Sequence, residues 1–413
     1  MEFIAAFLAD PERPRLARAM RRELSLCNHC LGRQFARLPG PELEARGASI
    51  RARLRLPPGD RCDICSGIFR SLDSWAERAA RAVEGLEFEN FQVGTRPGGL
   101  LVEAEEALWA RFGARWAEPF RMEMNRLAGE SLKARLGKRL AADRPDVAIL
   151  LDLSRDRVEV TVNSLFLFGR YRKLVRDIPQ TRWPCRECRG RGCPRCGGTG
   201  KMYAESVEEI IREPAVEAYS AKDGVLHGAG REDIDARMLG RGRPFVLELL
   251  EPRRRTADLD ALARRINEAT GSKVEVEGLR PSLPDEVVRL KEERFDKTYR
   301  VRFRVAPAPD GEALERTLAS LVATIRQQTP ARVAHRRADR FRERKVHSVR
   351  LLSRAPADRG LDAEAEIETE AGLYVKELLT GDGGRTEPSL AGLLGAAVEV
   401  LELDVLDVKM GAE

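Results

Sequence analysis

The sequence predicts an α+β protein of two or three domains, and three observations lead to this fold class. The chain has 413 residues, more than a single apolar core normally organises. In each half, some segments repeat their apolar residues at helical spacing and others alternate as strands do. A segment rich in cysteine, glycine and arginine, residues 183–202, separates the two halves.

The amino-terminal half contains helices followed by short strands. A helical pattern begins near Asp73, and residues 103–140 carry apolar side chains at helical spacing. Residues 147–151 and 158–162 read as strands, separated by a polar turn. We therefore expect a cysteine-bearing region over residues 1–72 and an α+β domain over residues 73–182.

The carboxy-terminal half predicts a strand-rich sheet with helices packed against it. Ser206 and Glu209 form a capping box, so a helix and a new domain, residues 203–413, begin here. A buried strand is expected over 245–250, and a helix around residues 259–266 stops at Gly271. An alternating strand follows over 299–305, and a helical face over 314–325. The last strands lie near Ile367 and over 398–408.

Composition is that of a soluble globular protein. Hydrophobic residues make up 43% and charged residues 33%, and 72 basic against 66 acidic residues give a net charge of +6. A polyanion would therefore be bound by local clusters of cations and not by bulk charge. The opening residues 1–10 are too short and too acidic for a secretory signal, and nothing later resembles a membrane span. We expect a cytoplasmic protein.

All eight cysteines fall in Cys-x-x-Cys pairs. Two such pairs complete a four-sulfur zinc site, which has no open position and is therefore structural. We predict one or two zinc ions; iron–sulfur or redox thiols are the alternatives, and spacing also allows a ligand shared between the two quartets. The expected ligands are Cys27, Cys30, Cys62 and Cys65 in one quartet and Cys185, Cys188, Cys193 and Cys196 in the other. The second quartet, in CRECRGRGCPRCGGTGK, resembles the zinc repeats of DnaJ-type proteins.

A carboxylate and several arginines are concentrated in the glycine-bounded segment GREDIDARMLGRGRPF, residues 230–245. Arginine favours the ionised form of a neighbouring carboxyl through its charge and its hydrogen bonds. An ionised aspartate can act as nucleophile or base near a phosphate-bearing substrate. The alternative is a solvated turn with a surface ion pair, which would contribute little.

A basic strip with interleaved aromatics runs from residue 168 to residue 183. It contains Arg170, Tyr171, Arg172, Lys173 and Trp183. Guanidinium groups and aromatic rings suit RNA phosphates and unstacked bases, so we expect RNA contact here. A solvated linker between domains is the alternative.

The segment 230–245 resembles the archaeal and eukaryotic tRNA pseudouridine synthase family that acts on uridines 54 and 55 of the TΨC arm. Its Gly-Arg-x-Asp is closest to that of the TruA group. The resemblance implies an isomerase that needs no organic cofactor, with tRNA as partner and no obligate protein partner or membrane. It also implies a zinc-bearing, THUMP-like accessory domain, whose pattern residues 91–96 fit, followed by a catalytic domain of the pseudouridine synthase fold.

The resemblance assigns roles to particular residues. Asp233 is the catalytic aspartate, Arg231 orients it, and Tyr299 stacks on the target base. In GLYVKEL, residues 372–378, Lys376 pairs with the aspartate and Leu378 lines the uracil pocket. We expect Asp235, two residues on in an extended loop, to point elsewhere. The residues expected to contact RNA are Tyr299, Tyr374, Arg170, Arg172, Lys173 and, in the basic stretch 332–345, Arg336, Arg337 and Arg340.

Two other classes compete with this interpretation. A methyltransferase or thiolation enzyme would need a nucleotide or methyl-donor loop, and the glycines of 96–100 and 381–384 lack the strand–glycine–helix context. A non-catalytic zinc-dependent RNA-binding module would explain the cysteines and arginines without requiring Asp233. The sequence leaves open whether uridine 54, uridine 55 or both are modified.

Overall fold

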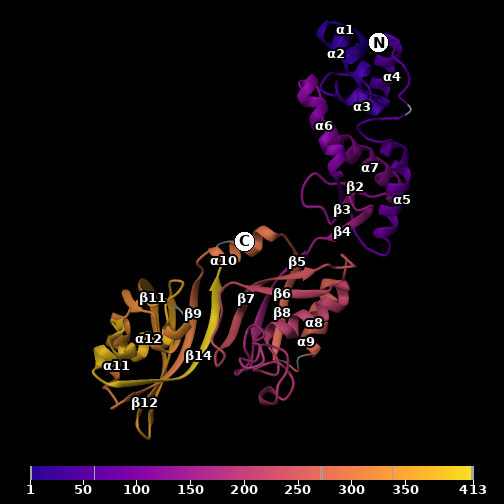
Figure 1. Ribbon diagram of the computed structural model, residues 1–413. Helices are drawn as coiled ribbons and strands as arrows, with labels where there is room; N and C mark the ends of the chain where they lie inside the picture. Colours follow the sequence, from indigo (N-terminus) through magenta and orange to yellow (C-terminus); the bar gives the residue numbers. More distant parts are fainter. Residues whose placement is uncertain (1, 60, 270, 272, 337, 411–413) are drawn as a thin grey trace. The chain divides into compact units, whose positions relative to one another are not determined.

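The computed structural model describes residues 2–59, 61–269, 271, 273–336 and 338–410, and the side chains of residues 335 and 336 are outside this description. The chain divides into two compact units (Figure 1). One unit comprises Met1–Asn163 with Arg253–Arg255, and the other comprises Ser164–Pro252 with Thr256–Glu413. Within the described residues, no helix is both long and apolar enough to pass through a bilayer.

The first unit begins with four short helices around the first cysteine quartet. They are α1 (Glu2–Leu8), α2 (Glu12–Glu23), α3 (Asn28–Arg33) and α4 (Leu43–Leu54). Helices α3 and α4 approach closely, because Gly32 and Gly47 have no side chains. A Cβ on Gly32 would lie 1.7 Å from the carbonyl oxygen of Leu43, and one on Gly47 would lie 1.9 Å from that of Asn28. This contact holds the Cys27–Cys30 turn against the rest of the core.

A four-stranded sheet completes the first unit, in the order β2-β1-β3-β4. The strands of this sheet are β1 (Asn90–Arg96), β2 (Arg139–Leu140), β3 (Val147–Asp152) and β4 (Arg157–Val162). The helices of this part of the unit are α5 (Leu72–Ala82), α6 (Gly99–Phe112) and α7 (Phe120–Leu136). Both predicted strands are confirmed. The helical pattern of 103–140 is two helices and not one, because Gly113 adopts φ +78° and Pro119 precedes α7.

The second unit is built on one large sheet. Its strand order is β13-β10-β11-β12-β9-β14-β7-β5-β8, with β6 paired to β7. The strands are β5 (Leu165–Lys173), β6 (Asp223–Gly228), β7 (Arg237–Leu250), β8 (Val274–Ser282), β9 (Asp296–Ala306), β10 (Thr324–Gln328), β11 (Phe341–Ala357), β12 (Gly360–Thr369), β13 (Thr386–Glu387) and β14 (Ala397–Lys409). The α+β class is confirmed.

Helices cover this sheet in two groups (Figure 1). The first group contains α8 (Val207–Tyr219), α9 (Leu259–Ala269) and α10 (Pro284–Glu292), and the second contains α11 (Gly311–Ser320), α12 (Val375–Thr380) and α13 (Leu390–Leu394). Ser206 caps the helix as predicted, because the backbone N–H of Glu209 donates to Ser206 Oγ at 3.3 Å. The Glu209 carboxylate accepts from that hydroxyl at 2.7 Å and not from the Ser206 backbone N–H, so the second bond of a capping box takes a different form. The helix expected over 314–325 ends at Ser320, because Ile325 pairs within β10.

The sheet has two halves, each with its own apolar core. The halves meet where β14 pairs with β7 in parallel over only two residue pairs, Asp404 with Arg237 and Val405 with Met238. Arg237 reinforces this joint by donating to both carboxylate oxygens of Asp404, at 3.0 and 2.7 Å. Side chains from both halves therefore meet at one seam.

Strand β5 corrects one expected boundary. We expected residues 73–182 to form a single domain, but β5 lies between β7 and β8 in the second sheet. Its pairing on both edges makes residues 165–173 part of the second unit. The basic strip is therefore not a solvated linker.

Candidate active site

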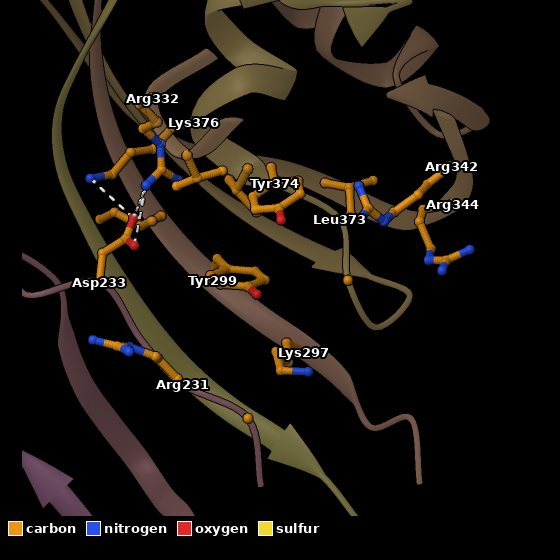
Figure 2. A pocket seen from close by; sticks show the side chains of 15 residues that line it. Arg231, Asp233, Lys297, Tyr299, Arg332, Arg342, Arg344, Leu373, Tyr374 and Lys376 are labelled. Atoms are coloured by element: carbon orange, nitrogen blue, oxygen red, sulfur yellow. Dashed lines mark hydrogen bonds and ion pairs between the residues drawn. The ribbon is translucent and has the colours of Figure 1, made fainter. Parts of the chain in front are cut away.

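A cavity of about 590 Å³ opens at the seam between the two half-sheets (Figure 2). Asp233 reaches it from the loop between β6 and β7, and Tyr299 from β9. Arg332 comes from a 3-10 turn, Ala331–Arg336, and Lys376 from the start of α12. Residues 233 and 376 lie far apart in sequence, so the site exists only in the folded unit.

The Asp233 carboxylate lies between two cations. Arg332 Nη1 is 3.1 Å and Lys376 Nζ is 3.5 Å from its Oδ2 (Figure 2). Arg332 is itself held by Glu377, with 2.7 Å between Nε and Oε1. Burial opposes the charge on Arg332, but the hydrogen bond to Glu377 and the charges of both carboxylates outweigh it and raise its pKa. The charge beside Asp233 is therefore permanent.

We expected Asp235 to point away from the site, but its carboxylate reaches the same lysine as Asp233 does. Lys376 Nζ lies 2.7 Å from Asp235 Oδ2, closer than it lies to Asp233. Burial opposes ionisation of Asp235, but the hydrogen bond and the charge of Lys376 prevail and lower its pKa. The residues between the two aspartates form a turn and not an extended strand, so both carboxylates reach one ammonium group.

A buried network anchors the loop that carries Asp233. Glu232 accepts from Arg243, with 2.7 Å between Oε2 and Nε, and from the Tyr171 hydroxyl at 3.0 Å. Arg243 also donates to the carbonyl of Ala229 at 2.6 Å, and Gln180 bridges the Tyr171 hydroxyl to the carbonyl of Gly230. Tyr171 is fully buried, so its ring does not interleave with RNA as the basic strip suggested.

The cations of the basic strip serve mainly the protein itself. Lys173 is fully buried and donates to the carbonyls of Asp233 and Ile234 at 3.3 and 3.0 Å. Burial therefore argues against the RNA contact expected of Lys173, and its ammonium instead holds the loop that carries Asp233. Arg172 pairs with two carboxylates of β8, Glu275 and Glu277. Arg170 is half-buried and donates to the carbonyl of Gly242 at 3.3 Å.

Tyr299 and Lys297 project from β9 into the cavity (Figure 2). Burial raises the pKa of Tyr299 to about 12; Arg243 opposes this rise and Asp233 adds to it. Its hydroxyl therefore stays protonated at neutral pH. Burial lowers the pKa of Lys297 to about 8, and the positive charge of Arg243 lowers it further. Lys297 was not among the residues expected from sequence.

The segment 372–378 contributes differently from what its motif suggested. Tyr374 lines the cavity, and its backbone N–H and carbonyl both bond to the buried amide of Gln327 at 2.9 Å. Leu378 is fully buried in the apolar core and does not line the cavity, which corrects its expected role. The apolar wall consists of Val333, Leu373, Val375 and Leu403.

Arg231 lies at the cavity but does not supply the guanidinium that pairs with Asp233. Its Cζ lies 5.2 Å from the centre of the Trp183 ring, whereas Arg332 pairs with the aspartate. The guanidinium that pairs with Asp233 is therefore that of Arg332 and not, as we expected, that of Arg231. That residue begins the basic stretch 332–345, and its charge was visible in the sequence, but its contact was not.

Cations dominate the lining of the cavity. Its charged side chains are Arg231, Lys297, Arg332, Arg342, Arg344 and Lys376, against the single carboxylate Asp233. Arg340, one of the expected RNA contacts, is exposed. Residue 337 and the side chain of Arg336 lie outside the described residues. An excess of cations around a carboxylate suits a substrate that carries phosphates.

Comparison with known proteins identifies the family. The family model described as "Pus10, C-terminal" matches residues 166–409, and "Pus10 THUMP domain, archaeal" matches residues 75–152. The chain belongs to the Pus10 family. Among its relatives are proteins named tRNA pseudouridine synthase Pus10 from Methanothrix thermoacetophila and Halorubrum lacusprofundi. Each is 45% identical; 93% of this chain is covered in both alignments, with 91% of the first relative and 93% of the second.

A third relative of the same name, from Pyrococcus furiosus, is 38% identical, with 95% of this chain and 97% of the relative covered. The THUMP match overlies β1, β3 and the helices between them. The Pus10 C-terminal match extends from β5 to β14 and contains every residue that lines the cavity.

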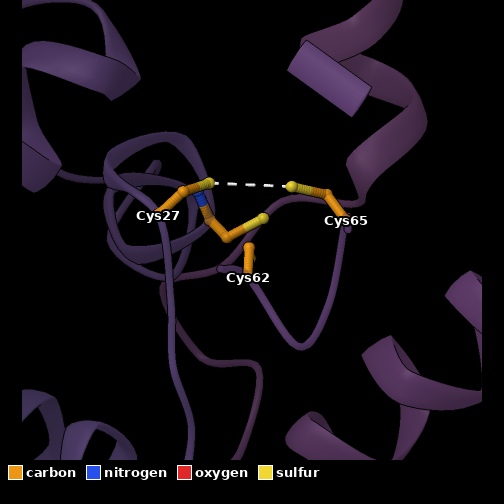
Figure 3. A group of neighbouring side chains, drawn as sticks. Cys27, Cys62 and Cys65 are labelled. Carbon is orange, nitrogen blue, oxygen red and sulfur yellow. Dashed lines mark hydrogen bonds between the residues drawn. The ribbon is translucent and has the colours of Figure 1, made fainter. Parts of the chain in front are cut away.

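Two cysteine quartets in this Pus10-family chain have the geometry of four-sulfur metal sites. In each quartet all four sulfur atoms lie within 4.8 Å of one another. Four sulfurs at about 2.3 Å from a tetrahedral ion would be about 3.8 Å apart. In the first quartet the sulfurs of Cys27 and Cys65 are 3.7 Å apart (Figure 3). The residues therefore fit a tetrahedral metal ion, and each quartet is complete in itself.

The second quartet fits equally well. The sulfurs of Cys185 and Cys193 are 3.9 Å apart, and those of Cys188 and Cys196 are 3.8 Å apart. The backbone N–H groups of Gly192 and Gly200 donate to sulfurs at 3.2 Å. Such donors stabilise thiolate ligands.

Proposed function

We propose that this chain isomerises uridine to pseudouridine at position 54, position 55 or both in the TΨC arm of tRNA. Membership of the Pus10 family and the relatives named tRNA pseudouridine synthase support the activity and the substrate. The observation that carries the proposal is the Asp233 carboxylate, held by Arg332 and Lys376 in a cationic cavity beside Tyr299.

The reaction rearranges bonds without a net change of atoms. The bond between ribose C1′ and uracil N1 breaks, a bond from C1′ to C5 forms, C5 loses its hydrogen and N1 gains one. No electrons enter or leave, so no organic cofactor is needed. Asp233 is the carboxylate that acts on the nucleoside, and Lys376 and Arg332 hold it in place. The neutral ring of Tyr299 supports the target base and its hydroxyl lies ready to take part in the proton transfer.

Binding must bring the uridine out of the folded arm, which costs a few kcal/mol. Stacking on Tyr299 and Tyr374 and phosphate contacts with the cations at the cavity offset this cost. We assign such phosphate contacts to Arg170, Arg336, Arg337 and Arg340. Both quartets hold structural zinc, the enzyme works in the cytoplasm, and it needs no obligate protein partner.

The test is a pseudouridine assay on unmodified tRNA transcript with chemical mapping of the modified positions. Wild type is compared with Asp233→Asn. The matched control is Asp235→Asn, because Asp235 pairs with the same lysine, Lys376, as Asp233 does. Product at 54 or 55 that disappears only in Asp233→Asn supports the proposal. Tight binding without product in wild type would favour a non-catalytic RNA-binding module, and product that survives Asp233→Asn would move the catalytic role to Asp235.

A further inference from the structure

Trp183 lies where the two ends of the segment that carries the second cysteine quartet come together. The two ends of the quartet segment are joined by backbone hydrogen bonds, from Cys185 N to the Gly200 carbonyl at 2.7 Å and from Met202 N to the Trp183 carbonyl at 2.9 Å. Pro184 and Lys201 form a β-bridge between these bonds. A metal ion bound by the four sulfurs therefore closes a loop whose base is Trp183.

This base is also fixed to the rest of the unit. Lys201 pairs with Glu209 at the start of α8, and the backbone N–H of Arg182 donates to the Glu208 carboxylate at 3.1 Å. The Trp183 ring meets the ring of Tyr203 edge to face, with centroids 5.7 Å apart and an angle of 83° between the planes. Contacts on both sides thus hold the indole in one orientation.

The indole forms part of the wall of a cavity beside the catalytic aspartate. This cavity, of about 300 Å³, is lined by Trp183, Arg231, Glu232, Asp233, Ile234, Asp235, Arg332 and Lys376. Arg231 lies over the indole, with Cζ 5.2 Å from the ring centre. Trp183 is only half-buried, although an aromatic ring of this size is more often used to fill a core.

A planar apolar ring next to a guanidinium is the surface on which nucleobases stack. Stacking of a base on an aromatic side chain contributes about 1–3 kcal/mol, and arginine adds a cation–π contribution. The indole carries no charge, so it offers a phosphate at most one hydrogen bond from its Nε1–H, whereas its ring face suits a base. Both side chains line the same cavity as Asp233. Trp183 is not among the residues that line the larger cavity with Tyr299, which places it beside the site of the target base.

We propose that Trp183 and Arg231 form a stacking surface for the nucleobase next to the target uridine, and that the second quartet, when it holds metal, keeps Trp183 in position. This inference rests on the proposed function for the identity of its RNA. It gives the second quartet a part in substrate positioning, through Trp183 and not through any contact of the metal with RNA.

The experiment uses the full chain carrying Asp233→Asn, so that bound RNA is not converted. A T-arm stem-loop RNA carries 2-aminopurine at each position flanking the target uridine in turn, and its fluorescence is titrated with protein. At one position we expect strong quenching on binding. Trp183→Leu should abolish that quenching and weaken binding roughly 10-fold, whereas Trp183→Phe, which keeps a ring, should retain most of both.

Arg231→Ala is a second variant that leaves the indole in place, so it tests the surface even if Trp183→Leu folds poorly. It should reduce the quenching at the same position. The reference is the Asp233→Asn chain without a further change. If Trp183→Leu and Arg231→Ala in that chain gave the same quenching and affinity as the reference at every position, the proposed stacking surface would be rejected. Pseudouridine formation by the unmodified enzyme is measured on the same RNA. If no pseudouridine forms, the proposed function is rejected. The proposed stacking surface is tested separately, by the positions at which fluorescence is quenched.

The role of the quartet is tested by Cys193→Ser with Cys196→Ser. Elemental analysis should show one metal ion fewer per chain, and the quenching attributed to Trp183 should fall while the thermal unfolding of the rest of the protein is retained. Full quenching after loss of the metal would overturn the bracing role.

Discussion

Arg243 and Glu232 form a fully buried ion pair, with 2.7 Å between Nε and Oε2. Glu232 directly precedes Asp233 in sequence, and the pair is completed by the Tyr171 hydroxyl and the carbonyl of Ala229. The position of the loop that carries Asp233 thus depends on charges that solvent does not reach.

Removal of one partner should therefore be costly. Glu232→Ala leaves the Arg243 guanidinium buried and unpaired, and we expect a loss of about 3–5 kcal/mol in the free energy of unfolding. Urea denaturation of the full chain measures this loss. The double variant Glu232→Met with Arg243→Met should lose less, because no charge is then stranded. A single-variant loss below about 1 kcal/mol would contradict the assignment.

Lys376 serves two carboxylates, and this predicts unequal effects of the two aspartates. Asp235→Asn frees Lys376 to pair fully with Asp233, so we expect less than about a tenfold fall in the single-turnover rate. Lys376→Met leaves Asp233 with Arg332 alone and should lower the rate by about 100-fold, in the range of a lost charge-assisted contact. Equal losses in both variants would show that Asp235 acts directly on the substrate.

Lys297 predicts a dependence of stability on pH. Its pKa is about 8 in the native state, against the ordinary value of 10.5 in the unfolded chain. Between pH 8 and pH 10.5 the unfolded state binds more protons than the native state, so wild-type stability rises with pH. The free energy of unfolding of the wild type therefore increases relative to that of Lys297→Met, by about 3 kcal/mol over this range. Below pH 8 the difference between the two proteins should be constant. Denaturation at several pH values checks both statements.

Loss of metal should affect the two quartets differently. Cys30, Cys62 and Cys65 belong to the apolar core of the first unit, so Cys62→Ser with Cys65→Ser should unfold that unit. The second quartet lies apart from the apolar cores of its own unit, so its removal should leave the sheet folded. Calorimetry with elemental analysis separates these outcomes. A first unit that stays folded in the Cys62→Ser, Cys65→Ser variant would show that the first quartet is not structural.

Arg336 and Arg337 predict a change in the salt dependence of tRNA binding. With both replaced by alanine, the slope of log affinity against log salt should flatten by roughly 1 to 2, because two phosphate contacts are lost. Arg316→Ala is the matched control, since this exposed arginine of α11 pairs with Glu312 away from the cavity. Unchanged slopes would remove both arginines from the RNA surface.

The resemblance of short motifs to those of a known family singled out Asp233, Tyr299, Tyr374 and Lys376. Local patterns predicted most of the secondary structure, because spacing is a property of short segments. The cysteine quartets followed from spacing for the same reason. The partners of these groups did not follow. Arg332 contacts Asp233 only because the two half-sheets meet at the seam. Arg231 contacts Trp183 because the quartet segment and the loop after β6, which are distant in sequence, lie together in the fold.

Burial was the other unpredictable property. Lys173 and Tyr171 have the composition of an RNA-binding strip, but β5 has neighbours on both edges, and this places them inside. Leu378 has the position of a pocket wall in its motif, but the short helix α12 turns it towards the core. Neither outcome is encoded in a window of neighbouring residues.

The seam has a consequence for synthesis of the protein. Strand β14 joins the two half-sheets and contributes Leu403 to the cavity wall, yet its residues 397–409 are translated after all the other strands. A nascent chain on the ribosome can fold its first unit and much of each half-sheet, but it cannot complete the cavity until β14 emerges. Contact between partly made enzyme and mature tRNA would then be unproductive, and full activity would appear only as the last strand is inserted.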